Sequence, residues 1–190
     1  TPTGKVELYS TVMERFGYDP LPYYEEPPES PVSSPELHRK YPLILNTGER
    51  SRYFFLSENR QMPSLRKMNP YPLVEINRET AKEYGIEDGD WVYIESPRGR
   101  ITQKAKLSDD MKKGVVNCQI GWWFPEREND TTYGLFEVNA NVLTSMQAPY
   151  DPAMGTYQLR GLLCRIWKNE DVSDKDFDPG KSVESLDISA

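Results

Sequence analysis

Residues 71–100 constrain the fold most, because they contain signals for a short helix, two tight turns and a strand within thirty positions. Asn77 is a favoured residue type at the start of a helix, and Gly85 can adopt the left-handed conformation that ends one. The pair Asp88–Gly89 then turns the chain into the apolar run that begins at Trp91. Elements this short and this closely spaced predict a small domain built mainly from strands and turns.

The pattern of apolar residues predicts that most of the remaining core is also strand. Residues 97–99, Pro-Arg-Gly, turn the chain back into residues 100–107, where apolar and polar side chains alternate as in a half-buried hairpin. Further apolar runs lie at residues 41–45, 115–118 and 159–167, and Asn46-Thr47-Gly48 after the first run has the composition of a turn. Several short strands with many turns and few helices predict a small closed barrel.

Both ends of the chain have compositions that are unusual for a packed core. Six prolines lie in residues 20–35, which predicts an extended strap or linker rather than a helix. Residues 169–190 carry seven carboxylates and two lysines, which favours a flexible tail over a segment with a specific docking role. We therefore expect a strap over residues 1–39, a compact domain over 40–168 and an acidic tail over 169–190. The first residue is Thr rather than Met, which suggests a fragment or a processed product.

Charge and composition argue against several classes of protein. The formal net charge of -7 disfavours a nucleic-acid-binding groove. Neither a membrane-spanning apolar run nor a signal peptide is recognisable, so no direct membrane insertion is expected. Cys118 and Cys164 each stand alone in apolar surroundings, and His38 is the only histidine. This predicts two buried thiols, with a disulfide as the less favoured alternative, a surface histidine, and no zinc or iron–sulfur site.

Two of the four segments that combine ligand-binding residue types lie early in the chain. In the first, the glycine lets the backbone approach a ligand, the short polar side chains offer donors and acceptors, and the arginine can fork onto a phosphate. It contains Asn46, Thr47, Gly48, Glu49 and Arg50. The second is a donor-rich loop that contains Ser57, Asn59 and Arg60. On residue types alone, a simple turn and a solvated loop are the commoner interpretations.

The other two segments are rich in tryptophan and in asparagine. Residues 121–126 read Gly-Trp-Trp-Phe-Pro-Glu, and adjacent tryptophans of an extended chain point to opposite faces. One can therefore pack inside while the other faces a ligand, although an aromatic cluster is usually core. Asn139 and Asn141 share a face if the chain is extended, and Thr144 follows. Amide groups suit the edge of a guanine or a pterin, but an Asn-rich turn explains the pattern equally well.

The order of these segments resembles the C-terminal dinucleotide-binding domain of the molybdopterin oxidoreductases, the DMSO reductase family. The opening TPTGKVELYS is similar to the TPSGKIEFYS that leads into that domain, so the resemblance covers residues 1 to about 168. Leu56 and Ile120 are departures, since relatives often carry histidine at these two positions. The resemblance implies a mainly β fold, a six-stranded double-psi β-barrel with one or two short helices. It also implies that loops at one rim of the barrel contact molybdopterin guanine dinucleotide.

The resemblance implies cofactor contacts from Asn46, Thr47, Gly48, Glu49, Arg50, Ser57, Asn59, Arg60, Gly121, Trp122, Asn139, Asn141 and Thr144. It implies no catalytic or metal-ligating residue here, because in the family the ligand to molybdenum or tungsten lies in an earlier domain. Any iron–sulfur cluster would also lie upstream. The expected partners are the other domains of the same catalytic subunit and electron-transfer subunits, with no nucleic acid.

The isolated chain is not expected to turn over a substrate. The substrate, the choice of metal and the compartment, cytoplasmic or periplasmic, stay open, and anaerobic respiration is the expected setting. The alternative is a free-standing double-psi barrel that serves as an adaptor, with the pair Trp122–Trp123 on a partner surface.

Overall fold

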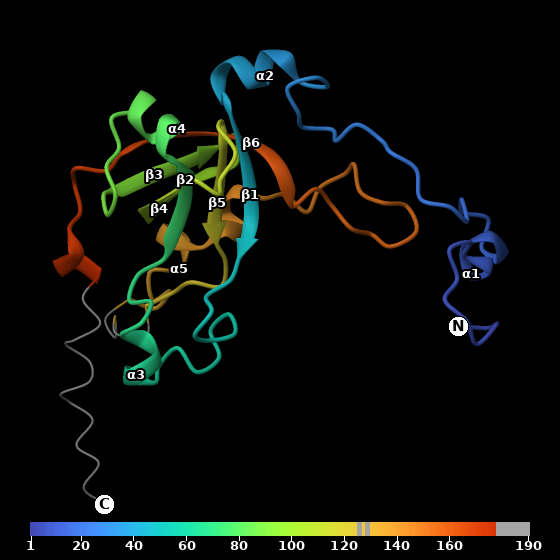
Figure 1. The fold of residues 1–190 in the computed structure, drawn as a ribbon, viewed down its shortest axis with the longest axis horizontal. Coiled ribbons are helices and arrows are strands. Elements are labelled where there is room, and N and C mark those ends of the chain that lie inside the picture. Colours follow the sequence, from blue (N-terminus) through green and yellow to red (C-terminus); the bar gives the residue numbers. More distant parts are fainter. Residues whose placement is uncertain (125–126, 128–129, 178–190) are drawn as a thin grey trace, which may run out of the picture.

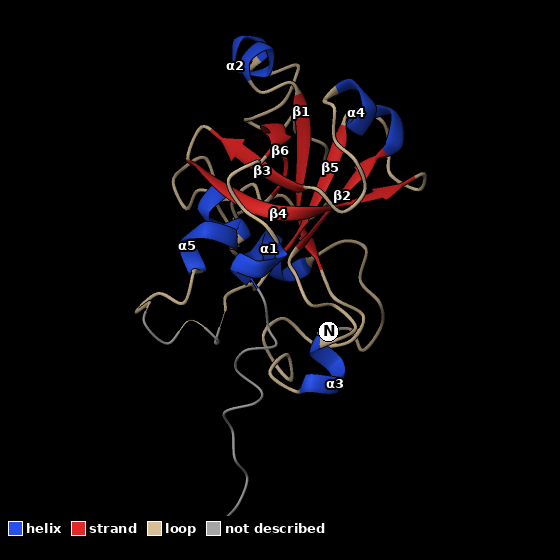
Figure 2. Cartoon of the chain, turned by 90° about the vertical axis from the view of Figure 1, so that its left-hand side faces the viewer, coloured by secondary structure: helices blue, strands red, loops and turns tan. Residues whose placement is uncertain are grey.

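The computed structural model describes residues 1–124, 127 and 130–177. Six strands close into a barrel in the order β1-β5-β2-β4-β3-β6 (Figures 1 and 2). The strands are β1 Leu43–Glu49, β2 Leu73–Asn77, β3 Trp91–Ser96, β4 Gly99–Ser108, β5 Val115–Gln119 and β6 Arg160–Lys168. The helices are α1 Thr11–Arg15, α2 Pro35–Lys40, α3 Pro63–Arg66, α4 Arg78–Glu83 and α5 Leu135–Val138, with 3-10 helices η1 Ala140–Leu143 and η2 Asp174–Phe177. The predicted mainly β fold, a six-stranded double-psi barrel with short helices, is confirmed.

The barrel mixes parallel and antiparallel strand pairs. Strand β1 pairs with β5 in parallel and β2 pairs with β4 in parallel, while the other neighbouring strands are antiparallel. Parallel neighbours cannot be joined by a tight hairpin, so the chain must cross over between them. Those crossovers gather loops from distant parts of the sequence at each end of the barrel.

Alternating side chains of the strands fill the barrel interior. Leu43 and Leu45 of β1, and Val74 and Ile76 of β2, are all buried. Each fully buried aliphatic side chain of this size contributes roughly 1.5–3 kcal/mol relative to an exposed one. The period-two pattern read from the sequence is therefore the pattern that packs the core.

The local predictions for residues 71–100 are confirmed. The side-chain oxygen of Asn77 accepts hydrogen bonds from the backbone N–H groups of Glu79 and Thr80, which caps α4. Gly85 follows that helix with a φ of 65°, in the left-handed region. The next hairpin closes tightly, since Ser96 at the end of β3 pairs with Gly99 at the start of β4.

The predicted turn at Asn46-Thr47-Gly48 is wrong, because these residues continue strand β1. Both neighbouring strands, β5 and β6, offer hydrogen-bond partners at this point, so the chain stays extended. The register with β5 shifts between Thr47 and Glu49, and Gly48 has a φ of 121°. Glycine thus serves a bulge that bends the end of the strand.

The N-terminal segment extends away from the barrel, with α1 at its far end (Figure 1). The predicted strap, residues 1–39, is not extended throughout, because α1 and most of α2 lie within it, whereas residues 16–34 contain no helix or strand. Pro35 begins α2 rather than extending the strap, because proline is well suited to the first turn of a helix.

The described start of the acidic segment lies against the barrel. Phe177 is buried and its ring centroid lies 4.3 Å from that of Trp91. The indole of Trp91 donates a hydrogen bond of 2.9 Å to Asp174. The side-chain amide of Asn169 donates one of 3.0 Å to the hydroxyl of Thr102 on β4. The domain boundary at residue 168 stays a prediction, and residues 178–190 lie outside the described residues.

The two cysteines are buried free thiols, as predicted. Burial raises the pKa of the Cys118 thiol to about 12 and raises that of Cys164 well above its ordinary value.

His38 is only partly exposed, and its Nε2 lies 3.2 Å from the main-chain oxygen of Pro42. Among the described residues, no three His, Cys, Asp or Glu side chains are grouped to hold a metal ion. None of the helices in the same ranges is long and apolar enough to cross a membrane.

Candidate functional site

The predicted site residues gather at one end of the barrel. Strands β1 and β5 run in parallel toward this end, and β6 begins there, with Asn46 paired to Arg160. Helices α3 and α5 lie at this end in both views, whereas α2 and α4 lie at the other (Figures 1 and 2). We call this end the rim and define it by residues 46–50, 55–61, 119–123, 139–144 and 159–161.

The end of β1 is tied to the start of β6 by side chains. The side-chain oxygen of Asn46 accepts a hydrogen bond of 3.1 Å from the Gly161 N–H. The hydroxyl of Thr47 donates one of 2.6 Å to the main-chain oxygen of Leu159, and Thr47 is buried. These two residues therefore hold the rim together, and Asn46 keeps a partly exposed side chain.

Gly48 of β1 lies close to the side chain of Arg160. A Cβ at this position would lie 3.3 Å from a guanidinium nitrogen of Arg160. The guanidinium therefore lies directly over the glycine, which leaves the Gly48 backbone and an exposed cation side by side. Such a pairing suits an anionic group of a ligand.

The next two residues connect the β1 end to the rest of the rim. The main-chain oxygen of Glu49 accepts a 3.1 Å hydrogen bond from the Ile120 N–H, and its carboxylate accepts one of 3.0 Å from Asn117. Arg50 is exposed, and its guanidinium carbon lies 5.3 Å from the ring centroid of Phe55.

The loop over residues 55–61 has one buried anchor and two presented side chains. Arg60 is 1% exposed, donates a 2.7 Å hydrogen bond to the Gly121 oxygen, and lies 4.8 Å from the ring centroid of Trp122. Ser57 and Asn59 are exposed, and Asn59 adopts a φ of 63°. Arg60 therefore supports the rim from its buried side through the contacts with Gly121 and Trp122, while Ser57 and Asn59 are available to a ligand.

The two tryptophans differ in burial, and the inner one is Trp122, although both rings lie near the guanidinium of Arg60, at 4.8 and 5.1 Å from their centroids. Trp122 is 1% exposed and packs in an aromatic cluster with Phe54 and Phe124. Trp123 is only partly buried, and its ring makes an edge contact with the ring of Tyr133, with 5.8 Å between the two ring centroids. Pro125 and Glu126 of this motif lie outside the described residues.

The preceding Gly121 turns the chain at the rim with a φ of 73°. A Cβ added there would lie 3.2 Å from the Cβ of Leu56. The turn thus brings residues 119–123 against the loop that carries Ser57 and Asn59.

The Asn-rich segment is not extended, so of the two interpretations that the sequence left open, the structure has the turn. Asn139 caps the 3-10 helix η1, and its side-chain oxygen accepts a 3.0 Å hydrogen bond from the Asn141 N–H. This local bond favours a turn over an extended chain. The Asn139 amide nitrogen donates to the Trp122 oxygen at 3.2 Å, while Asn141 is exposed. The hydroxyl of Thr144 donates to the Asn141 oxygen at 3.1 Å.

A network of buried amides supports this arrangement. The side chain of Gln103 accepts from the Gln119 N–H at 3.2 Å and donates to the Gln119 and Val138 oxygens at 2.9 and 3.0 Å. The side-chain oxygen of Gln119 in turn accepts from the Trp122 indole at 3.0 Å. Both the tryptophan segment and the start of η1 are therefore held by the same two glutamines.

The printed sequence carries little signal for several residues that shape the rim. Arg160 stands over Gly48 only because β6 pairs with β1, a contact between residues more than a hundred positions apart. Gln103 and Gln119 lie on strands and read as ordinary polar strand residues. The sequence does point to Trp123, since adjacent tryptophans of an extended chain predict that one ring faces outward.

The rim fits a dinucleotide with a planar heterocycle and phosphates. Its exposed amides, Asn59 and Asn141, can pair with the polar edge of a heterocycle, and its exposed guanidiniums, Arg50 and Arg160, can pair with phosphates. Residues 120–122 join the β1 end to η1 through the Glu49 and Asn139 contacts described above.

Comparisons with known proteins place the chain in a family. A sequence model of the family described as "Molydopterin dinucleotide binding domain" matches residues 43–163. A dopamine dehydroxylase of Eggerthella lenta is 43% identical over 172 residues, which cover 88% of this chain and 17% of that protein. An acetylene hydratase of Syntrophotalea acetylenica is 38% identical over 173 residues, covering 88% of this chain and 24% of that protein.

The solved structure of acetylene hydratase from Pelobacter acetylenicus superimposes with a TM-score of 0.79 and 37% identity. The match covers 89% of this chain and 24% of that one, so the chain spans about a quarter of that structure and 17% of the dehydroxylase. The chain therefore belongs to the molybdopterin dinucleotide-binding domain family of molybdenum and tungsten oxidoreductases, whose cofactor is molybdopterin guanine dinucleotide.

Proposed function

We propose that this chain covers the cofactor within a larger molybdenum or tungsten oxidoreductase subunit and holds the nucleotide portion at the rim. The observation that carries the proposal is the bridge formed by residues 120–122. This bridge brings residues 46–50 and 139–144 to the same end of the barrel. Because the curated relatives are several times longer, the other domains of the same subunit would complete the site.

The predicted site residues divide into two groups by exposure. Thr47, Arg60, Trp122 and Asn139 are buried and bonded within the rim, so their role in the proposal is to fix its shape. The exposed or partly exposed residues are available to the ligand, and these are Asn46, Gly48, Glu49, Arg50, Ser57, Asn59, Gly121, Asn141 and Thr144. Arg160 and Trp123 join this second group on geometry, since both are at the rim and neither is buried.

The chemistry of the whole protein belongs to the metal centre that the cofactor carries, which supplies electron transfer or activation of a small molecule when bound. This chain contributes binding, orientation and exclusion of water on one side. The names of the two relatives, a dehydroxylase and a hydratase, denote different reactions. We therefore assign the choice of substrate to the other domains rather than to the rim.

The adaptor alternative depended on an exposed pair of tryptophans. Because Trp122 is 1% exposed, the pair does not form a continuous surface patch, and only Trp123 can face a partner. The structure thus gives the adaptor interpretation less support than the cofactor interpretation.

Binding of guanosine monophosphate to the 190-residue chain tests the proposal, because this probe carries the base and one phosphate. Asn141→Asp removes an amide donor and adds a negative charge, and Arg160→Met removes a cation. Each change should weaken binding by roughly 5- to 30-fold, the equivalent of one lost charge-assisted or buried hydrogen bond. Arg39→Met alters an exposed arginine of α2 at the opposite end of the barrel and should leave the affinity unchanged. Equal weakening by all three variants would refute the rim as the binding site.

A further inference from the structure

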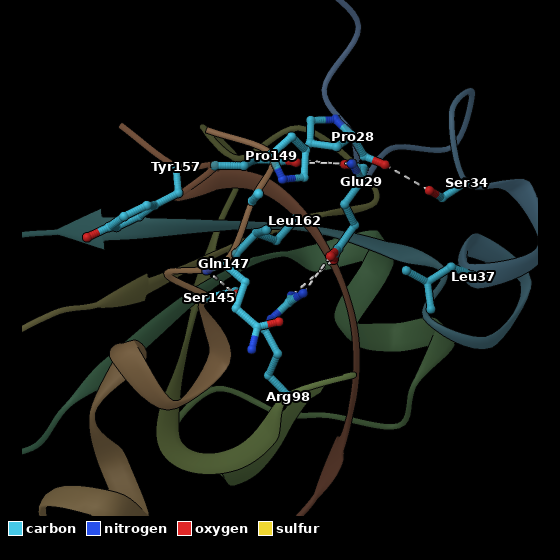
Figure 3. A pocket seen from close by; sticks show the side chains of 12 residues that line it. Pro28, Glu29, Ser34, Leu37, Arg98, Ser145, Gln147, Pro149, Tyr157 and Leu162 are labelled. Atoms are coloured by element: carbon cyan, nitrogen blue, oxygen red, sulfur yellow. Dashed lines mark hydrogen bonds and ion pairs between the residues drawn. The ribbon is translucent and has the colours of Figure 1, made fainter. Parts of the chain in front are cut away.

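A residue of the proline-rich strap reaches a polar cavity beside the rim. The cavity measures about 220 Å³ and lies between the strap, the turn after β3 and the loop over residues 145–149. Figure 3 shows the carboxylate of Glu29 and the guanidinium of Arg98 pointing toward each other and bonded directly in the lining of this cavity. The strap is therefore in contact with the barrel at this point, although its first part extends away (Figure 1).

Glu29 is held from several directions. Its carboxylate accepts two hydrogen bonds from Arg98, at 2.6 and 3.1 Å, and one of 2.6 Å from the Leu163 N–H of β6. Its main chain pairs with the side-chain amide of Gln158, which accepts from the Glu29 N–H at 3.0 Å and donates to the Glu29 oxygen at 2.8 Å. A side chain with this many partners has one orientation.

Arg98 carries the contact onward to the rim. Its Nε donates a 2.6 Å hydrogen bond to the main-chain oxygen of Leu143, the last residue of η1. The hydroxyl of Ser96 donates to the same oxygen at 3.0 Å. Leu143 lies between Asn141 and Thr144, two of the residues proposed to face the ligand. A continuous series of bonds thus connects the strap to the asparagine segment.

The partial burial of the pair favours a positional role over a purely stabilising one. The side chain of Arg98 is 22% exposed and that of Glu29 is 12% exposed. A largely buried ion pair contributes little net stability, because the lost hydration offsets the attraction between the charges. Its geometry is nevertheless restrictive, since a forked guanidinium that binds both carboxylate oxygens cannot also rotate. Without Glu29, the Arg98 guanidinium can rotate into the open cavity. The main-chain oxygen of Leu143 then keeps the hydrogen bond from the Ser96 hydroxyl but loses the one from Arg98.

We propose that Glu29 is a positioning residue for the rim, acting through Arg98 to set the orientation of η1 and hence of Asn141. The strap is then part of the binding apparatus rather than a passive linker. The effect on ligand affinity rests on the function proposed above, whereas the effect on the position of η1 does not require a ligand.

The test compares Glu29→Gln, Arg98→Met, the double variant and Arg98→Lys with a control, Glu36→Gln. Glu36 lies in α2 and pairs with the exposed Arg39, so its removal leaves the Glu29 contacts intact. The first readout is the amide signals of residues 141–145 and of the Asn141 side chain, recorded by NMR without ligand. The second readout is the affinity for guanosine monophosphate.

We expect Glu29→Gln and Arg98→Met to shift the signals of residues 141–145 and to weaken binding about two- to tenfold, while Glu36→Gln does neither. The double variant should be no weaker than Arg98→Met, because both changes break the same series of bonds. Arg98→Lys should not restore affinity, since an ammonium cannot fork onto Glu29 and bond Leu143 together.

Three results would overturn the inference: unmoved signals at residues 141–145 in Glu29→Gln, additive losses in the double variant, or full rescue by lysine. If the unmodified chain fails to bind guanosine monophosphate, the proposed function is at fault, and the ligand-free signals still decide whether Glu29 positions η1.

Discussion

Gln103 and Gln119 are hydrogen-bonded to each other although their strands are not neighbours in the barrel. Gln103 lies on β4, Gln119 ends β5, and β2 runs between these two strands. The side chain of Gln103 bonds both main-chain groups of Gln119 and also the Val138 oxygen that precedes the asparagine segment. The buried side-chain amide of Gln103 thus provides the hydrogen bonds that a neighbouring strand would otherwise provide at the end of β5, where the rim begins.

Replacing Gln103 with Met keeps the size of the side chain but leaves three buried main-chain groups without their partner. Each such group costs about 1–3 kcal/mol, and relaxation will recover part of that cost, so we expect a loss of roughly 2–5 kcal/mol in the free energy of unfolding. Urea denaturation measures it. Gln147→Met, at an exposed position, is the matched control and should stay within about 0.5 kcal/mol of the parent. Similar values for both variants would show that the amide network does not support the rim.

The contact of Phe177 with the barrel gives a second prediction, which also tests the domain boundary at residue 168. Its ring lies 4.3 Å from that of Trp91 and 4.9 Å from that of Phe124, measured between centroids. Phe177→Ala should lower stability by about 3 kcal/mol and shift the tryptophan emission to longer wavelength, because Trp91 gains access to water. Phe16→Ala, at a side chain that is 69% exposed, is the control. No difference between the two would mean that the domain ends near residue 168, as composition predicts.

The sequence predicted best those features whose cause is local. The cap at Asn77, the left-handed Gly85 and the tight hairpin between β3 and β4 each depend on a few adjacent residues, and each was predicted correctly. The barrel class followed from several short strands with many turns and few helices, and its double-psi form from the resemblance to a known family.

The sequence failed where distant strands decide the outcome. Asn46-Thr47-Gly48 has the composition of a turn, but β5 and β6 both bond to it and keep it extended. The position of Arg160 over Gly48 depends on the same pairing. For Asn139 and Asn141, the sequence left an extended segment and a turn equally open, and the side-chain cap of η1 decides for the turn. The candidate site residues were therefore predicted as segments, whereas their separation into buried and exposed side chains required the structure.

The bulge at Gly48 gives a third prediction. Gly48→Ala places a methyl group at a φ of 121° and 3.3 Å from the Arg160 guanidinium. We expect a loss of about 1–3 kcal/mol in stability from backbone strain. The double variant with Arg160→Met should lose less than the sum of the single changes, because the crowding is relieved. Gly17→Ala, at a positive φ with no atom within 4 Å of the added Cβ, measures strain without crowding. Strict additivity would contradict the placement of Arg160.

The buried thiol of Cys118 gives a prediction about pH. Its pKa is raised from 9.0 to about 12 by burial, so well below pH 9 the thiol is protonated in both states and has no effect on stability. As the pH rises above 9, the unfolded thiol ionises while the folded one stays protonated, and stability is lost. This loss should reach about 2 kcal/mol near pH 10.5.

The measurement compares the free energy of unfolding of the parent with that of Cys118→Ala between about pH 8 and about pH 10.5. The alanine variant cannot ionise at this position, so its stability should fall less steeply than that of the parent. Cys164 is present in both chains, and because burial is the largest cause of its raised pKa, most of its contribution cancels, while the smaller part due to Cys118 is lost in the variant. Parallel curves for the two chains would contradict the burial of an un-ionised Cys118.

We expect the rim to hold the nucleotide portion of the cofactor. The most direct test is to titrate a nitrogen-15-labelled sample of the chain with guanosine monophosphate and to map the perturbed backbone amides. Saturable shifts should fall on residues 46–50 and 139–144, with smaller ones at residues 120–123, and cytidine monophosphate should perturb the asparagine segment less. Shifts confined to the strap or to residues 169–177 would contradict the claim, as would equal shifts for the two nucleotides.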